Sequence, residues 1–266
     1  MFFSVLRLTA GFNPSFIHDT SDAAIAANSF NLTPKFPLHP SMESFIADYS
    51  EDNDELFEKI RQNKSNYLKT IDKVFSQREI PVELKYLAIV ESQLKTTAKS
   101  GVGAVGVWQF MPGTAKIFGL KVTSGYDERQ HLWKSSVAAA KYLNELYDIF
   151  GDWLLVIASY NSGPAPVLNA IKKTGSRNFW KLQYFLPKET RNHVKRFIAT
   201  HYYFEGKGSL VTLGKAESEK YLRELEAFNS KNNSNDEDDT TDPTALLSQW
   251  IAVVNHEENL DFILKK

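Results

Sequence analysis

The sequence predicts an all-α protein on two observations. From Asp54 onward, apolar residues recur at three- and four-residue steps, which is the period of a helix that buries one face. Prolines and glycines stand where such stretches begin and end, and no segment shows convincing strand alternation with hairpin turns. We therefore expect a helical globule over residues 53–206, with an extended leader before it and a helical appendage after it.

The first half of the globule contains three expected helical regions. One follows Asp54, and a second opens at Pro81, which suits a first helical turn, and reaches about Ser92. After a glycine-rich loop, a short helix is expected from Pro112 to Gly119. The apolar residues that mark the first region are Leu56, Phe57, Ile60, Tyr67, Leu68, Ile71, Val74 and Phe75.

The second half contains four expected helices with clear start or stop residues. Asp127 is a candidate cap for a long helix from roughly Gln130 to Phe150, and Gly151 can end it. The next helix runs from Trp153 to Tyr160. Asp152 can cap that helix. Another helix opens at Pro164 and runs to about Lys173, before Gly175, and the last opens at Pro187 and ends at Gly206.

The two ends of the chain differ from this helical pattern. Residues 1–52 carry four prolines and no sustained period, so we interpret them as an extended, partly disordered leader. An accessory amphipathic helix is expected over 207–228. Residues 229–243 are polar and acidic, which is typical of a disordered linker, and a short helical tail follows over 244–266.

Composition excludes several classes of function. Of 266 residues, 42% are hydrophobic and the formal net charge is −1, so no basic footprint for nucleic acid is expected. The absence of cysteine excludes disulfides, thiolate metal sites, cysteine nucleophiles and a lipid-anchored cysteine. The six histidines lack paired metal-ligand spacing, so neither a metal nor another cofactor is expected.

The N-terminus leaves the export route open. Residues 1–12 are mostly apolar but too short and too interrupted for a clear secretory signal. They fit the remnant of a signal that starts upstream about as well as an ordinary mobile N-terminus.

Glu91 occupies a position where a core residue is expected. Leu84, Leu87, Ala88 and Glu91 are spaced so that they share one helix face. Burial of a carboxyl group favours its neutral form, and a protonated carboxylic acid can act as a general acid. By spacing alone, a glutamate that rims the apolar stripe and reaches solvent is the more frequent arrangement.

The segments after Glu91 change this balance. Glu91-Ser92 is followed by Ser100-Gly101, then by Gly106 to Gln109 (Gly-Val-Trp-Gln), and later by Ser159 to Gly163 (Ser-Tyr-Asn-Ser-Gly). This order resembles the lytic transglycosylase domain of glycoside hydrolase family 23, whose fold is related to goose-type lysozyme. The phrases around Asp127, Asp152 and Pro187 are similar to its membrane-bound lytic murein transglycosylase D branch. The resemblance covers about residues 80–205.

The resemblance implies a lysozyme-like fold and one reaction. Such enzymes cleave peptidoglycan between N-acetylmuramic acid and N-acetylglucosamine and leave 1,6-anhydro ends. A single glutamic acid, here Glu91, serves first as acid and then as base, so the usual second carboxylate is not needed. Two alternatives stay open: a muramidase that hydrolyses with water, and a noncatalytic peptidoglycan-binding protein. Peptidoglycan strands are the expected partner, in the periplasm or cell envelope, with peripheral association possible.

The resemblance also assigns substrate-binding residues. Gln109 and Asn161 are expected to hydrogen-bond the sugar or its acetamido groups, and Tyr160 to border the cleft. Trp108 offers a flat apolar face for a sugar ring, against the alternative of core packing. Four further positions belong to the same motifs. Ser92 and Ser100 would hold the glutamate or the loop, or else cap a helix end, and Gly106 and Val107 are the other two.

His193 departs from the pattern of the family. The family usually carries a tyrosine there, a few residues after the Pro-x-Glu-Thr phrase, and this tyrosine is thought to orient the catalytic acid. An imidazole can also donate a hydrogen bond, but it is shorter and can become charged. We expect slower or more alkaline-shifted activity than is usual in the family, unless His193 points elsewhere and Tyr202 or Tyr203 replaces it.

Overall fold

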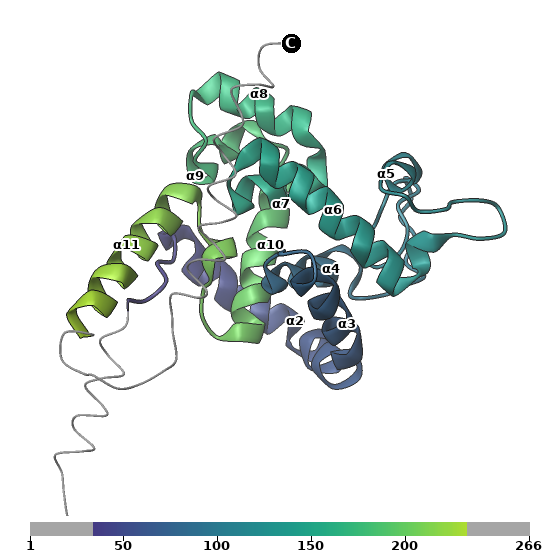
Figure 1. The fold of residues 1–266 in the computed structure, drawn as a ribbon, viewed down its shortest axis with the longest axis horizontal. Helices are drawn as coiled ribbons and strands as arrows, with labels where there is room; N and C mark the ends of the chain where they lie inside the picture. The colour runs from purple at the N-terminus through teal and green to yellow at the C-terminus, as the bar shows by residue number, and fades with distance from the viewer. Residues whose placement is uncertain (1–33, 233–266) are drawn as a thin grey trace, which may run out of the picture.

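A helix that is buried along most of its length, α7 (Trp153–Ser162), lies at the centre of the molecule (Figure 1). The structure is a computed structural model that describes residues 34–232. Every residue of α7 from Trp153 to Ser159 is buried, because the segment is apolar on all sides rather than along one stripe. The fold is organised by the helices that cover it.

Three long helices cover α7 directly: α6 (Leu132–Phe150), α8 (Pro164–Thr174) and α10 (Lys188–Glu205). The N-terminal helices form a second shell, in which α2 and α4 pack on α10 while α3 packs on α6. The remaining α-helices are α2 (Glu43–Asn63), α3 (Ser65–Ser76), α4 (Tyr86–Ser92), α5 (Pro112–Ile117), α9 (Phe179–Leu182) and α11 (Lys215–Asn232).

Short 3₁₀ turns join several of these helices: η1 (Pro40–Met42), η2 (Val82–Lys85), η3 (Glu128–Gln130), η4 (Gln183–Phe185) and η5 (Leu210–Thr212). The all-α prediction is confirmed, since residues 34–232 contain only isolated β-bridges and no strand. Within the same range, no helix combines the length and apolar character that crossing a membrane requires.

Most of the expected helix ends lie where the sequence predicts them, but one predicted capping residue caps a different element. Gly151 ends α6 in the left-handed conformation, and Gly206 does the same for α10. Asp127, however, caps η3 by accepting from the Arg129 amide, and His131 caps α6. The prediction that Asp127 caps the long helix is therefore wrong, because a 3₁₀ turn intervenes.

The helical region begins earlier than its apolar period suggests. Helix α2 starts at Glu43, inside the predicted leader 1–52. Its first two turns carry only a short stripe of half-buried apolar side chains, Phe45, Ile46 and Tyr49, which pack on the core. Residues 34–39 form no helix or strand, in keeping with an extended leader, and the part before residue 34 lies outside the described residues.

The C-terminal appendage also differs in its limits. The expected helix over 207–228 is the turn η5 followed by α11, which continues to Asn232 and so includes the first residues assigned to the linker. The rest of the predicted linker 229–243 and the tail 244–266 lie outside the described residues.

Asp152 joins this appendage to the central helix. Its Oδ1 accepts a hydrogen bond from the Leu155 amide at 3.1 Å and so caps α7, while its Oδ2 accepts from the Lys215 amide at 2.7 Å at the start of α11. One buried carboxylate therefore serves two helix N-termini. Burial raises the pKa of Asp152 to about 6, although the backbone hydrogen bonds oppose this effect.

The raised pKa of Asp152 predicts a specific pH dependence of stability. Because the folded protein holds this proton more tightly than the unfolded chain, the stabilisation is present below about pH 4 and is lost as the pH rises through 6. We expect wild type to lose roughly 2 kcal/mol relative to Asp152→Asn between pH 4 and pH 7. Urea unfolding of both proteins across this range measures the difference, and a constant difference would contradict the assignment.

Candidate active site

Glu91 lies in the last turn of α4, at the edge of the core. The side chains of Leu84, Leu87 and Ala88 on the same stripe are fully buried, whereas the Glu91 side chain keeps 13% of its surface exposed. The helix ends two residues later at Gln93, which has a left-handed conformation. The carboxyl group is therefore largely enclosed and still reachable from one side, as a general acid must be.

His193 is the polar partner of Glu91. Its Nε2 lies 3.0 Å from Glu91 Oε1, and its side chain is only 5% exposed. The residue comes from the second turn of α10, which packs against α4. Its Nδ1 is buried without a hydrogen-bond partner among residues 34–232, so the tautomer with the proton on Nε2, donating to the carboxylate, satisfies the pair best.

The alternative partners of the acid are engaged elsewhere. The Tyr203 hydroxyl donates to Asp54 and Glu58 on α2, so it does not serve Glu91. Tyr202, also on α10, lies more than two turns beyond His193. His193 therefore lies beside Glu91, at the place where the resemblance in sequence puts the family's tyrosine.

Tyr160, from the end of α7, borders the same site. Its hydroxyl donates a hydrogen bond to the Trp108 carbonyl at 2.9 Å, which ties the central helix to the loop that carries Gln109. Burial, and after it the negative charge of Glu91, raise the pKa of the Tyr160 hydroxyl. This hydroxyl is therefore a fixed neutral donor beside the acid.

Asn161 is held by a residue that the sequence analysis did not single out. The Thr190 hydroxyl, in the first turn of α10, donates to Asn161 Oδ1 at 2.9 Å. Both side chains come from helix ends that meet, and Asn161 remains half-buried. The sequence signal that could have indicated Thr190 is the Pro-Lys-Glu-Thr phrase, in which it is the last residue.

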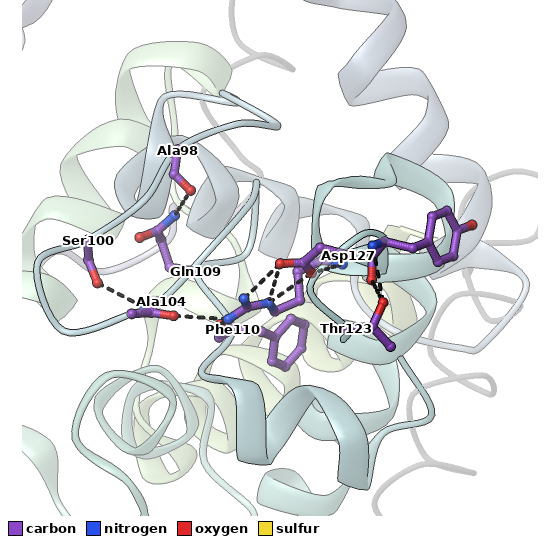
Figure 2. A network of polar contacts seen from close by, with 10 residues as sticks. Ala98, Ser100, Ala104, Gln109, Phe110, Thr123 and Asp127 are labelled. Atoms are coloured by element: carbon purple, nitrogen blue, oxygen red, sulfur yellow. Dashed lines mark hydrogen bonds and ion pairs between the residues drawn. The ribbon is translucent and has the colours of Figure 1, made fainter. Parts of the chain in front are cut away.

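Gln109 turns its amide towards the backbone of its own loop. Its Nε2 donates to the Gly106 carbonyl at 2.7 Å and approaches the Ala98 carbonyl at 3.4 Å, the contact drawn in Figure 2. Its φ of +47° lies in the left-handed region, which is uncommon for a residue with a side chain. No hydrogen bond within the described residues engages its Oε1.

Two serines stabilise the backbone around the acid. The Ser92 hydroxyl donates to the Val107 carbonyl at 2.8 Å and so joins the end of α4 to the loop. Ser100 accepts from the Ala104 amide at 2.9 Å and closes a turn, as Figure 2 shows. These contacts position the loop beside Glu91.

Trp108 corrects a prediction. Its side chain is 0% exposed, packs near Phe75 with ring centroids 5.4 Å apart, and donates through Nε1 to Ser136 at 3.0 Å. Its face is therefore not available to a sugar ring. Val107 is equally buried, so the assignment of its side chain to substrate binding is also wrong: an apolar side chain packs the core here while the neighbouring backbone faces the site.

Comparison with known proteins gives this arrangement a family. The model of the transglycosylase SLT domain matches residues 71–183. These residues form an SLT domain. The matched range contains Glu91, Gln109, Tyr160 and Asn161 but ends before His193, whose place beside Glu91 is given by the tertiary structure.

Among its relatives, the SLT domain is similar to the membrane-bound lytic murein transglycosylase D of Escherichia coli K12. The two are 42% identical over 128 residues, which cover 46% of this chain and 28% of the relative. A peptidoglycan transglycosylase, gp16 of Escherichia phage T7, is 33% identical over 117 residues, or 43% of this chain and 9% of that protein. The chain thus spans under a third of these two relatives.

The fold agrees with a solved structure. A 70-kDa soluble lytic transglycosylase in complex with bulgecin A superposes with a TM-score of 0.50 at 22% identity, over 65% of this chain and 32% of that one. This likeness concerns the fold alone, and it agrees with the predicted lysozyme-like helical architecture.

Arg129 holds the loop of the SLT domain in place, which the sequence analysis did not foresee. It is a buried arginine whose Nη1 donates to the carbonyls of Gly103 and Phe110, both at 2.9 Å, while Asp127 accepts from the rest of the guanidinium (Figure 2). The Asp127-to-Arg129 phrase contained this pair, but only the fold shows what the guanidinium contacts.

Gly106 is required by this packing rather than by a substrate. Its φ is +85°, and a Cβ there would overlap the backbone carbonyl of Arg129. Its assignment to substrate binding is therefore replaced by a structural role, the close approach of two backbones.

Gly106→Ala tests this role against a matched glycine in the same loop. We expect a loss of on the order of 3 kcal/mol in unfolding free energy, because the new methyl group meets rigid backbone and the conformation is unfavourable. Gly101→Ala is the control, since its Cβ would meet nothing within 4 Å. Equal denaturant midpoints for the two variants would contradict the packing argument.

Proposed function

We propose that this protein is a peptidoglycan lytic transglycosylase that uses Glu91 as its single acid and base. The enclosed Glu91 carboxyl group, hydrogen-bonded to His193 at the meeting point of three helix ends and a fixed loop, is the observation that carries this proposal. The SLT domain and the names of its relatives support the same reaction class.

Four other carboxylates in the SLT domain and on α10, Asp127, Glu128, Asp152 and Glu189, bear on the single-acid mechanism. Each has a different role: Asp127 pairs with Arg129, Glu128 with Lys134, Asp152 caps two helices, and Glu189 is exposed on the first turn of α10. A hydrolytic muramidase of the two-carboxylate type requires a second carboxylate that is free to activate a water molecule opposite the acid, and three of these four are engaged in other contacts.

The proposed chemistry returns the proton to its donor. His193 occupies Oε1 of Glu91, so Oε2 is the oxygen that donates its proton to the glycosidic oxygen as the bond to the anomeric carbon breaks. The resulting carboxylate then accepts the proton of the C6 hydroxyl, whose oxygen bonds to the anomeric carbon and closes the 1,6-anhydro ring. No water is consumed.

Two amides are suited to recognise N-acetylated sugars. The Oδ1 of Asn161 accepts from Thr190, which leaves its Nδ2 to donate to an acetamido carbonyl. Conversely, the Nε2 of Gln109 is engaged by the loop, which leaves Oε1 to accept from an acetamido N–H. Asn161 thus offers a donor to an acetamido carbonyl, and Gln109 offers an acceptor to an acetamido N–H.

The substrate implies a place in the cell. Peptidoglycan strands lie outside the cytoplasmic membrane, so we propose an exported protein of the periplasm or cell envelope. The relative's name, a membrane-bound enzyme, supports an envelope location.

Replacing the acid tests the mechanism. We expect Glu91→Gln to lower turnover of purified sacculi at least about 100-fold, because glutamine cannot donate the proton, while binding is retained. Glu189→Gln, which changes an exposed carboxylate on α10, should keep wild-type turnover. Mass analysis of the products decides the class: anhydro-muramoyl ends support a transglycosylase, reducing ends a muramidase, and no products from wild type a noncatalytic binder.

Replacing His193 tests its role as the residue that orients the acid. His193→Phe should lower kcat about tenfold or more with little change in KM, because Glu91 loses its hydrogen-bond donor. His193→Tyr should restore much of the rate, because a tyrosine hydroxyl can also donate a hydrogen bond to the Glu91 carboxyl group. An equal kcat for wild type and His193→Phe would contradict the orienting role.

A further inference from the structure

Two consecutive aromatic rings lie exposed on the turn η4, directly before α10. Tyr184 is 74% exposed and Phe185 is 55% exposed, whereas the residues on either side, Gln183 and Leu186, are buried. The Leu186 amide donates to the Gln183 carbonyl at 3.0 Å. The rings are therefore presented by an anchored turn and not by a frayed segment.

The turn is anchored by further contacts. Gln183 Nε2 donates to the Trp180 carbonyl at 3.1 Å, and the guanidinium of Arg191 lies 6.0 Å from the centre of the Tyr184 ring. Burying Tyr184 and Phe185 would be the usual fate of such large apolar groups, so their exposure on a fixed turn indicates a binding surface.

The surroundings of the two rings are basic. Lys181 and Lys188 are exposed, Arg191 is half-buried, and Glu189 is the one acidic residue on this stretch from 181 to 191. Arg191 makes no ion pair within residues 34–232; its Nη1 reaches only the Leu186 carbonyl, at 3.5 Å. The surface therefore combines apolar ring faces with unpaired positive charge.

This surface continues the candidate active site. The turn η4 leads into α10, whose first turn carries Thr190, bonded to Asn161, and whose second turn carries His193, bonded to Glu91. It also contacts α8 and α9, which lie at the end of the molecule away from α2 and α3 (Figure 1). The two rings thus precede Thr190, which holds Asn161, by five and six residues along the chain.

We propose that Tyr184 and Phe185, with Arg191 and Lys188, form a second binding surface for the glycan strand. The rings would stack on the apolar CH faces of pyranose residues, and the two cations would bind carboxylates of the acidic peptide stems. The ligand class is thus an N-acetylated glycan with acidic peptide substituents. This inference rests on the proposed function, because it concerns the same substrate strand at a distance from the bond that is cut.

Binding of inactive protein to insoluble sacculi tests the surface without turnover. In the Glu91→Gln background, we expect Tyr184→Ala/Phe185→Ala to raise the Kd in co-sedimentation roughly tenfold, a change of about 1.4 kcal/mol. Tyr184→Trp should keep the affinity. The matched control is Ile117→Ala on α5, which removes an aliphatic side chain that is 77% exposed and distant in sequence from η4.

A salt series separates the cationic contribution. Arg191→Gln should weaken binding severalfold at low ionic strength and much less at high ionic strength, because salt screens exposed charges. All variants should unfold at nearly the wild-type temperature, since the changed side chains are at the surface.

Several outcomes would overturn the proposal. An unchanged Kd for Tyr184→Ala/Phe185→Ala would do so, as would an equal loss in Ile117→Ala. Loss of binding to vesicles of anionic phospholipid, with sacculus binding intact, would assign the rings to a lipid surface instead. If wild type yields no cleavage products while sacculus binding still depends on the two rings, the proposed catalytic function fails and this surface stands.

Discussion

The burial of α7 is the constraint on which the rest of the structure depends. A helix that is apolar on all sides must be covered on all sides, and α6, α8 and α10 do so. Its N-terminus is capped by Asp152 in the interior, while its last turn emerges from the core. Tyr160 and Asn161 are placed at the site because the helix stops being buried there.

The candidate site is formed where the ends of several helices and one loop meet, and no single element contains all of its residues. Glu91 ends α4, Asn161 ends α7, Thr190 begins α10, and the loop with Gln109 is fixed by hydrogen bonds from Ser92 and Arg129. Because these groups are held by hydrogen bonds to other elements, the proposed acid has a fixed position, and preorganisation of this kind favours catalysis. His193 fits this design, since its only polar partner among the described residues is the carboxyl group that it orients.

Much of the fold could be predicted because helix ends are encoded locally. Gly151 and Gly206 supply left-handed ends, and Asp152 caps α7 as expected. The failures have a physical reason in each case. The first turns of α2 carry only a short, half-buried apolar stripe directly after the prolines of the predicted leader. Trp108 belongs to a loop, where spacing says nothing about which side of the backbone is buried.

The sequence by itself determined the helical class, most helix limits and Glu91 as the proposed acid, because periodicity, capping residues and ordered motifs are properties of neighbouring residues. Only the tertiary structure decided which groups surround that acid. The contact between Glu91 and His193 joins residues 102 positions apart, and the buried guanidinium of Arg129 reaches back 26 residues to Gly103. Such partners are fixed by helix packing, since residues this far apart in the sequence meet only when the elements that carry them pack together.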